Sequence, residues 1–270
     1  MGWLTPISCP TDKIGDDMPD FLIDSLLPTK RVHLLGGTSN IGKSRWLLPT
    51  LVEWSQGKPI MGFPSHPVSW AYVSGDRLLV EAQDTIKGLG IPLEAIPIIP
   101  AFGQHNKTWP QVLEVASKMS IGLLAWEGFG DLVPPPGLKN QVREFLSAMS
   151  AHCCGERSSF PGGLTIIGVM ESPKMKPSER YKSPRERISG VASWGYHTSS
   201  VMLIEAADPE NVSDPRRIFH ASLKNSSSFT AQGVFDSTGH IKFGLPDIGP
   251  TIESEEELVE ELREYAKKHR

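Results

Sequence analysis

The sequence predicts a single α/β domain built on a mostly parallel sheet flanked by helices, and three observations support this fold class. An apolar run at residues 32–35 enters a glycine-rich turn that leads directly into a helical pattern. Further apolar runs at residues 68–74, 121–128 and 164–170 alternate with helical patterns, as in βαβ units. Finally, 270 residues suit one large domain with appendages, which we favour, or two small ones, and either can bury a core without stabilising disulfides or metals.

Composition excludes several classes of protein. No apolar run approaches the roughly 20 residues needed to span a bilayer. The first ten residues lack the basic and apolar regions of a secretory signal, so we expect a cytoplasmic protein. Cys9, Cys153 and Cys154 show no metal-ligand spacing, and the formal net charge of −4 argues against a surface that binds nucleic acid everywhere.

The turn after the first apolar run carries the clearest chemistry. Residues 37–44 read G-T-S-N-I-G-K-S and match the pattern G-x-x-x-x-G-K-[ST], with a strand before and a helix after. Backbone N–H groups at such a helix start cradle phosphate, while the lysine reaches the β- and γ-phosphates and the serine binds Mg²⁺. A chance match in a glycine-rich turn is the alternative, and the strand–helix context disfavours it. The predicted phosphate contacts are Gly37, Thr38, Ser39, Asn40, Ile41, Gly42, Lys43 and Ser44.

An acid follows the strand predicted at residues 68–74. At the carboxyl end of a strand beside the phosphate loop, Asp76 is well placed to orient or deprotonate a water molecule. Asp76 can equally be the N-cap of the helix predicted at residues 78–89, because aspartate is a favoured capping residue. The two roles are compatible.

Two more apolar strands end in acids. Glu127 ends the run at residues 121–128, where a Walker B strand carries the carboxylate that holds Mg²⁺. Glutamate is one methylene longer than the usual aspartate, and a simple loop carboxylate is the alternative. Asp131 is a second acid nearby, and Glu171 follows the strand at residues 164–170, where a polar sensor would face the nucleotide.

The remaining pattern completes the domain. We expect an N-terminal arm at residues 1–29, a core domain at 30–246, and a linker and helix at 247–270. Within the core, the apolar pattern predicts helices at residues 43–56 (with Pro49 inside), 109–119 and 141–153. It also predicts a short strand at 98–99 and strands at 201–205, 217–223 and 233–243, the last as a hairpin. Residues 131–140 read as a proline-stiffened loop. Residues 252–269 predict the terminal helix.

A basic segment lies at residues 173–190. It carries a local excess of positive charge, few apolar residues and three prolines, so we expect a mobile loop. Its cations can grip a phosphate backbone while Tyr181 stacks on a base, although a solvated loop is the alternative. The candidate nucleic-acid contacts are Lys174, Lys176, Arg180, Tyr181, Lys182, Arg185 and Arg187.

The order of these blocks resembles a known family. After the phosphate loop come Y-V-S-G-D-R, L-L-A-W-E-G-F-G, I-I-G-V-M-E-S-P-K, the basic segment, I-S-G-V-A-S-W and R-I-F-H-A-S-L-K-N. Over residues 30–244 this series resembles the RecA-fold P-loop ATPases of the RepA/DnaB-like hexameric replicative helicase group.

The resemblance implies ATP and Mg²⁺ as cofactors and a hexameric ring around single-stranded DNA in DNA replication. It implies that Asp76 is the catalytic base, that Glu127 holds Mg²⁺, and that the segments at 131–140 and 173–189 line a central channel. The family's Lys-x-Arg pair falls on residues 224–226, where only Lys224 is kept. The alternatives are a regulator or loader of the same fold and a nucleotide-gated assembly module with little turnover.

Overall fold

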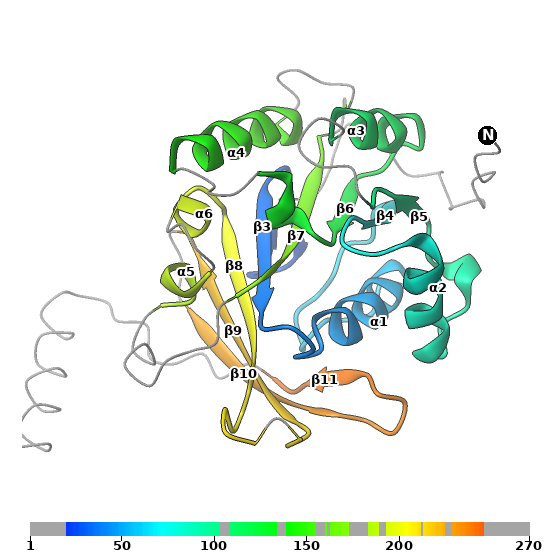
Figure 1. Ribbon diagram of the computed structural model, residues 1–270, viewed down its shortest axis with the longest axis vertical. Helices are drawn as coiled ribbons and strands as arrows, with labels where there is room; N and C mark the ends of the chain where they lie inside the picture. Colours follow the sequence, from blue (N-terminus) through cyan, green and yellow to red (C-terminus); the bar gives the residue numbers. More distant parts are fainter. Residues whose placement is uncertain are drawn as a thin grey trace, which may run out of the picture.

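The computed structural model describes residues 20–102, 109–133, 139–154, 160, 163–172, 183–188, 193–211, 213–224 and 228–245. These residues form a nine-stranded sheet in the order β11-β10-β9-β8-β3-β7-β6-β4-β5 (Figure 1). Six neighbouring strands are parallel: β8 (Ser200–Ala206), β3 (Val32–Gly37), β7 (Thr165–Glu171), β6 (Leu123–Trp126), β4 (Trp70–Ser74) and β5 (Ile98–Pro100). The antiparallel strands β9 (Arg216–Leu223), β10 (Phe229–Phe235) and β11 (Ile241–Phe243) extend one edge.

Helices cover both faces of the sheet (Figure 1). Helices α1 (Lys43–Ser55) and α2 (Leu79–Gly88) pack on one face, and α3 (Trp109–Lys118) and α4 (Lys139–Cys153) pack on the other. Successive residues of a strand point to opposite faces, so in β3 Leu35 joins the α1 core and Leu34 joins the α4 core. Both faces of the central parallel strands β3, β4, β6 and β7 are buried, which explains their nearly continuous apolar sequence. In the part of the chain that the structure describes, no helix is long and apolar enough to cross a membrane.

The described end of the predicted arm packs on the α1 face. β1 (Phe21–Ile23) and β2 (Leu27–Pro28) form a two-stranded antiparallel sheet. Leu22 is fully buried, and its carbonyl accepts a hydrogen bond of 3.2 Å from Nε1 of Trp54 in α1. The backbone of residues 20–28 is thus fixed to the core by apolar burial and a buried hydrogen bond.

The predicted architecture is confirmed, with local differences. The parallel sheet, the flanking helices and the C-terminal antiparallel hairpin are all present, but the hairpin strand begins at Phe229 rather than at residue 233. Part of the predicted basic loop is the short helix α5 (Pro184–Arg187), and α6 (Ser193–Tyr196) is a second short helix that the pattern did not predict. Two 3-10 turns complete the elements, η1 (Leu93–Ala95) and η2 (Phe129–Leu132). The predicted terminal helix at 252–269 lies outside the described residues.

The start of α5 shows why the loop prediction was wrong there. The sequence S-P-R-E places a serine before the helix and a glutamate three residues later, which is a capping box with proline at the first helical position. The Ser183 N–H and hydroxyl both donate to Oε2 of Glu186, at 2.8 and 2.9 Å. The capping box therefore favours a helical turn at these residues, although the composition of the segment is polar.

Candidate active site

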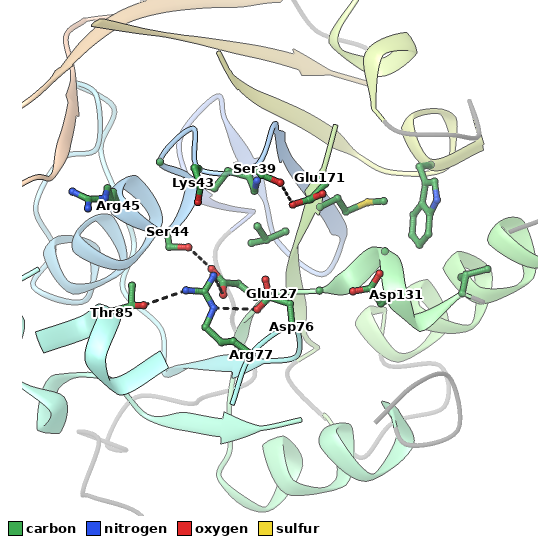
Figure 2. A pocket seen from close by; sticks show the side chains of 18 residues that line it. Ser39, Lys43, Ser44, Arg45, Asp76, Arg77, Thr85, Glu127, Asp131 and Glu171 are labelled. Carbon is green, nitrogen blue, oxygen red and sulfur yellow. Dashed lines mark hydrogen bonds and ion pairs between the residues drawn. The ribbon is translucent and has the colours of Figure 1, made fainter. Parts of the chain in front are cut away.

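The carboxyl ends of β3, β7, β6 and β4 meet at one edge of the sheet because these four strands are parallel. A cavity of about 1170 Å³ lies at this edge, bounded by the start of α1 on one side and by the turn after β4 on the other (Figure 2). It is the location that open parallel sheets use for ligands. The polar and charged side chains that line it are those of Ser39, Asn40, Lys43, Ser44, Arg45, Asp76, Arg77, Thr85, Glu127, Asp131 and Glu171.

The glycine-rich turn connects β3 to α1 as predicted. Gly42 has a φ of +107° and lies against the β10–β11 hairpin, where an added Cβ would be 2.5 Å from Cδ1 of Ile241. Both the backbone angle and this contact require glycine. Lys43 donates from Nζ to the carbonyl oxygens of Gly37 at 2.9 Å and Thr38 at 3.0 Å. The ammonium group is therefore held at the mouth of the loop.

The charge of Lys43 is set by opposing effects. Burial lowers the pKa of Lys43, and the carboxylates of Glu171, Glu127 and Asp76 act against this by favouring the charged form. The lysine thus faces three acids across the cavity. A tetra-anionic ligand such as a nucleoside triphosphate would complement this cation and the loop N–H groups.

Glu127 lies on the cavity wall next to α1. The Ser44 hydroxyl, in the first turn of α1, donates to Oε1 of Glu127, whose side chain is only 2% exposed. Burial raises the pKa of Glu127, and the nearby Asp76 carboxylate adds to this effect, whereas Arg77 and the hydrogen bonds from Ser44 and Tyr72 oppose it. Glu127 is thus part of the cavity and not a carboxylate of an outer loop.

Asp76 does not cap α2. The N-cap position is Leu78, and its N–H donates to Oε2 of Glu81 at 2.9 Å. Asp76 instead lines the cavity, where its carboxylate accepts a hydrogen bond of 3.2 Å from Nε of Arg77. The structure therefore does not support the capping interpretation of this residue.

Arg77 is one of the polar cavity residues that the sequence analysis did not predict, together with Arg45 and Thr85. Its Nη2 lies 2.9 Å from Oε2 of Glu127, and its Nη1 donates to Oγ1 of Thr85 in α2 at 3.2 Å (Figure 2). Burial lowers the pKa of Arg77, but the neighbouring carboxylates outweigh burial and leave it above its usual value. The sequence does place Arg77 directly after Asp76, and a cation next to a candidate catalytic acid is an unusual feature that could have drawn attention to it.

Two further acids lie at the cavity. Glu171 ends β7, and its Oε1 accepts a hydrogen bond from the hydroxyl of Ser39 in the glycine-rich turn. Asp131, from η2, also lines the cavity. The position predicted for a polar sensor thus contacts the loop directly.

Other candidates lie away from this cavity. Lys224 is exposed and directly follows β9. The last residue of β9, Leu223, pairs with Ser200 at the start of β8, and Ser200 pairs with His33 near the start of β3. Lys224 therefore lies near the amino ends of the parallel strands, whereas the glycine-rich turn lies at their carboxyl ends. Lys224 therefore cannot reach the cavity of its own chain.

Two of the basic-segment arginines are bound within the protein. Arg185 donates to four carbonyl oxygens, those of Gly195 (2.6 Å), Thr198 (2.9 Å), Ser199 (2.7 Å) and Ser222 (3.1 Å). Arg187 forms an ion pair with Glu205 of β8. These guanidinium groups connect α5 to the sheet. The other candidates, Lys174, Lys176, Arg180, Tyr181 and Lys182, lie outside the described residues.

The donor set of the cavity suits Mg²⁺. Among the described residues no group of three or more His, Cys, Asp or Glu side chains is arranged to hold a metal ion alone. A hydroxyl from Ser44 and a carboxylate from Glu127 are nonetheless hard oxygen donors of the kind that Mg²⁺ takes together with substrate phosphates and water. The cationic group of Arg77 already lies against Glu127, which shows that this position favours positive charge.

Comparison with solved structures is consistent with this geometry. A KaiC-like protein from the hyperthermophilic archaeon Pyrococcus horikoshii matches 87% of this chain and 99% of its own, with a TM-score of 0.58 and 12% sequence identity. The chain has a RecA-like α/β fold. At this identity the likeness shows the fold alone, and it does not single out the replicative helicase group. No family model matches the sequence, and the search of curated proteins gives no match.

Proposed function

We propose that this protein binds ATP with Mg²⁺ and hydrolyses it. One observation carries the proposal: Lys43 and Ser44 of the glycine-rich turn share a cavity with Asp76 and Glu127, which come from the ends of two other strands. This combination of a phosphate cradle, a lysine, a hydroxyl and two acids is what phosphoryl transfer requires. The RecA-like fold supports the same function.

Each residue has a defined task in this proposal. Lys43 and the loop N–H groups bind the β- and γ-phosphates, while Ser44 and Glu127 hold Mg²⁺, which neutralises developing charge on the phosphate oxygens when bound. Asp76 orients the attacking water and accepts its proton. Glu171 responds to the γ-phosphate through its hydrogen bond with Ser39. These tasks use groups that already line one cavity.

At a finer level, we propose a ring-forming, helicase-like motor that acts on single-stranded DNA, with a hexamer as the expected assembly. The order of sequence blocks supports this, and so does the cation-rich segment between β7 and α5. In this proposal Lys224, which lies at the end of the sheet opposite the cavity, acts on the nucleotide of a neighbouring subunit, as the family resemblance implies.

A second candidate is a same-fold ATPase that regulates or loads another protein, or a nucleotide-gated assembly module with slow turnover. Two observations favour it. Residue 226, where the helicase group has its arginine, is serine in this chain, which removes a transition-state cation. Arg77 also pairs with Glu127, so the metal carboxylate is engaged before any ligand arrives.

One experiment separates these functions. ATP turnover is measured with and without single-stranded DNA, alongside the molecular mass with and without nucleotide. DNA-stimulated turnover by a ring supports the motor, slow unstimulated turnover supports the regulator, and nucleotide-dependent assembly without turnover supports the module. The Asp76→Asn variant is the control, because it should bind ATP as the wild type does and lose turnover.

A further inference from the structure

Arg77 is placed as a cation between the two acids of the cavity. Its Nε lies 3.2 Å from Oδ1 of Asp76, and its Nη2 lies 2.9 Å from Oε2 of Glu127. The Thr85 hydroxyl accepts from Nη1 at 3.2 Å and fixes the orientation of the guanidinium plane. All three nitrogens of one side chain are therefore used to bridge two strand ends and α2.

This placement has an electrostatic reason. Two carboxylates that share a partly buried site repel each other, and one of them protonates unless a cation is present. Glu127 is nearly fully buried, whereas Asp76 is 38% exposed, so the cost of leaving Glu127 charged and unpaired is the larger. A guanidinium group cannot give up its proton at physiological pH, which makes it a permanent counter-ion.

The same placement conflicts with metal binding. A Mg²⁺ ion at Ser44 and Glu127 would bring two more positive charges to the carboxylate that Arg77 already neutralises. Arg77 also lines the cavity that holds Lys43, so a polyphosphate there would offer the guanidinium new anionic partners. Phosphate and metal together can thus replace the ion pair, whereas a metal ion alone has to compete with Arg77 for Glu127.

We propose that Arg77 is a built-in cation that blocks divalent-metal binding at Glu127 until a nucleotide polyphosphate enters, and that Arg77 then exchanges Glu127 for phosphate oxygens. This rests on the proposed ATP site and assigns Arg77 as the residue that makes metal binding depend on nucleotide. Arg77 acts on the metal through Glu127, so it is a positioning residue for the metal site and a direct ligand of phosphate.

The test measures Mn²⁺ affinity of the full chain without nucleotide, using the electron paramagnetic resonance signal of free Mn²⁺. The Arg77→Met variant should bind Mn²⁺ roughly tenfold more tightly than the wild type, within the range of ordinary coupling between sites. Arg45→Met is the matched control, because Arg45 lines the same cavity but contacts Gly239 and Phe235 instead of the acids. It removes the same charge and should leave Mn²⁺ affinity unchanged.

Further variants keep the test decisive. Arg77→Met with Glu127→Gln should lose the gain in affinity. Arg77→Lys retains the charge, replaces Arg77→Met in the test if that variant does not fold, and should show a smaller gain. Equal Mn²⁺ affinity of wild type, Arg77→Met and Arg77→Lys would overturn the proposal, as would a gain that persists in the double variant or appears in Arg45→Met.

A second measurement separates this proposal from the proposed function. Non-hydrolysable ATP should tighten Mn²⁺ binding more in the wild type than in Arg77→Met, because only the wild type must release the ion pair. If the wild type binds no nucleotide at all, the ATP assignment fails, whereas the nucleotide-free comparison of Mn²⁺ affinities still decides whether Arg77 blocks a metal site. If nucleotide binds and tightens Mn²⁺ equally in both proteins, the ATP assignment stands and the role of Arg77 is refuted.

Discussion

Asp76 and Glu127 come from different strands, and two glycines allow them to meet. A Cβ at Gly75 would lie 2.2 Å from the carbonyl oxygen of Glu127, and Gly128 has a φ of +69°, so both turns depend on the absence of a side chain. Both acids were singled out in the sequence because each follows a buried strand, and both line the cavity; their catalytic and metal-binding roles stay predictions. The sequence places Arg77 next to Asp76, but it could not predict the contact of Arg77 with Glu127, because a guanidinium reaching across two strand ends depends on a distance that no local pattern encodes.

At this same scale, His33 makes folding sensitive to acid. Its Nε2 donates to the carbonyl oxygen of Pro28 at 2.8 Å and its side chain is fully buried, so desolvation lowers its pKa to about 4. The unfolded chain, with a pKa of about 6.5, binds more protons than the folded one between these values. The contribution of neutral, buried His33 to the free energy of unfolding is therefore complete above pH 6.5 and is lost as the pH falls toward 4. We expect a loss of about 2 kcal/mol at pH 5 from this residue.

Thermal melts at pH 7.5 and pH 5 check this expectation. A His33→Gln variant keeps a donor to Pro28 but cannot titrate, so its melting temperature should change less between the two pH values than that of the wild type. His197→Gln, which changes an exposed histidine, is the control and should behave as the wild type does. An unchanged pH response in His33→Gln would refute the assignment to His33.

At the scale of elements, the β10–β11 hairpin supports the glycine-rich turn. Arg217 of β9 is buried, donates from Nε to the carbonyl oxygen of Ile41 at 3.0 Å, and has its Cζ 4.6 Å from the centre of the Phe235 ring. The Phe235 ring and Ile241 also pack on Gly42. The loop that would hold phosphate is therefore fixed by the last described strands of the chain.

We predict that Gly42→Ala disrupts this packing. The new methyl group would lie 2.5 Å from Ile241 and 3.0 Å from the Phe235 ring, at a φ that alanine adopts only with strain. The expected cost is about 1–3 kcal/mol, together with weaker nucleotide binding. Gly88→Ala is the matched control: it also adds one methyl group, but at the end of α2 with no atom within 4 Å, and should be neutral or slightly stabilising. Equal melting temperatures for the two variants would contradict this account.

Elements differ in how far the sequence could define them. The strands of the parallel sheet were predicted because a short, continuous apolar run is typical of a strand that is buried on both faces. Basic composition suggested a loop where α5 forms, and it could not show that Arg185 would bind four carbonyl oxygens of distant segments. The start of β10 was missed although F-T-A-Q alternates between buried and exposed residues, because this run is short and only Phe229 in it is large and apolar.

At the scale of the whole molecule, charge distribution bears on the proposed DNA partner. The formal net charge is −4, so binding to a polyanion requires a local concentration of cations. Because the protein itself engages Arg185 and Arg187, the proposed contact depends on the cations at residues 174–182. These residues connect β7, at the cavity edge, to α5.

Neutralising Lys174, Lys176 and Lys182 to glutamine should weaken binding to single-stranded DNA. Each lost phosphate contact removes about 0.7 from the slope of log affinity against log salt, so the triple variant should lose about 2 in total. ATP binding without DNA should not change. Fluorescence anisotropy with a labelled oligonucleotide at several salt concentrations measures both quantities.

The control for that variant replaces Lys58, Lys87 and Lys118, three exposed lysines elsewhere on the chain, and so removes the same total charge. It should retain the wild-type affinity and slope. If both triple variants behave alike, general charge governs binding and the segment at residues 174–182 has no special role.

The measurement that tests the central claim most directly is ATP binding by calorimetry, with Mg²⁺ present, to the wild type and to Lys43→Ala. The Lys43 ammonium lies at the mouth of the glycine-rich turn, so the variant should lose a charge-assisted phosphate contact worth about 1.5–3 kcal/mol, roughly 10- to 150-fold in affinity. Its melting temperature without nucleotide should stay close to that of the wild type. Wild-type ATP affinity in a folded Lys43→Ala protein, or no ATP binding by the wild type, would contradict the assignment of this cavity as a nucleotide site.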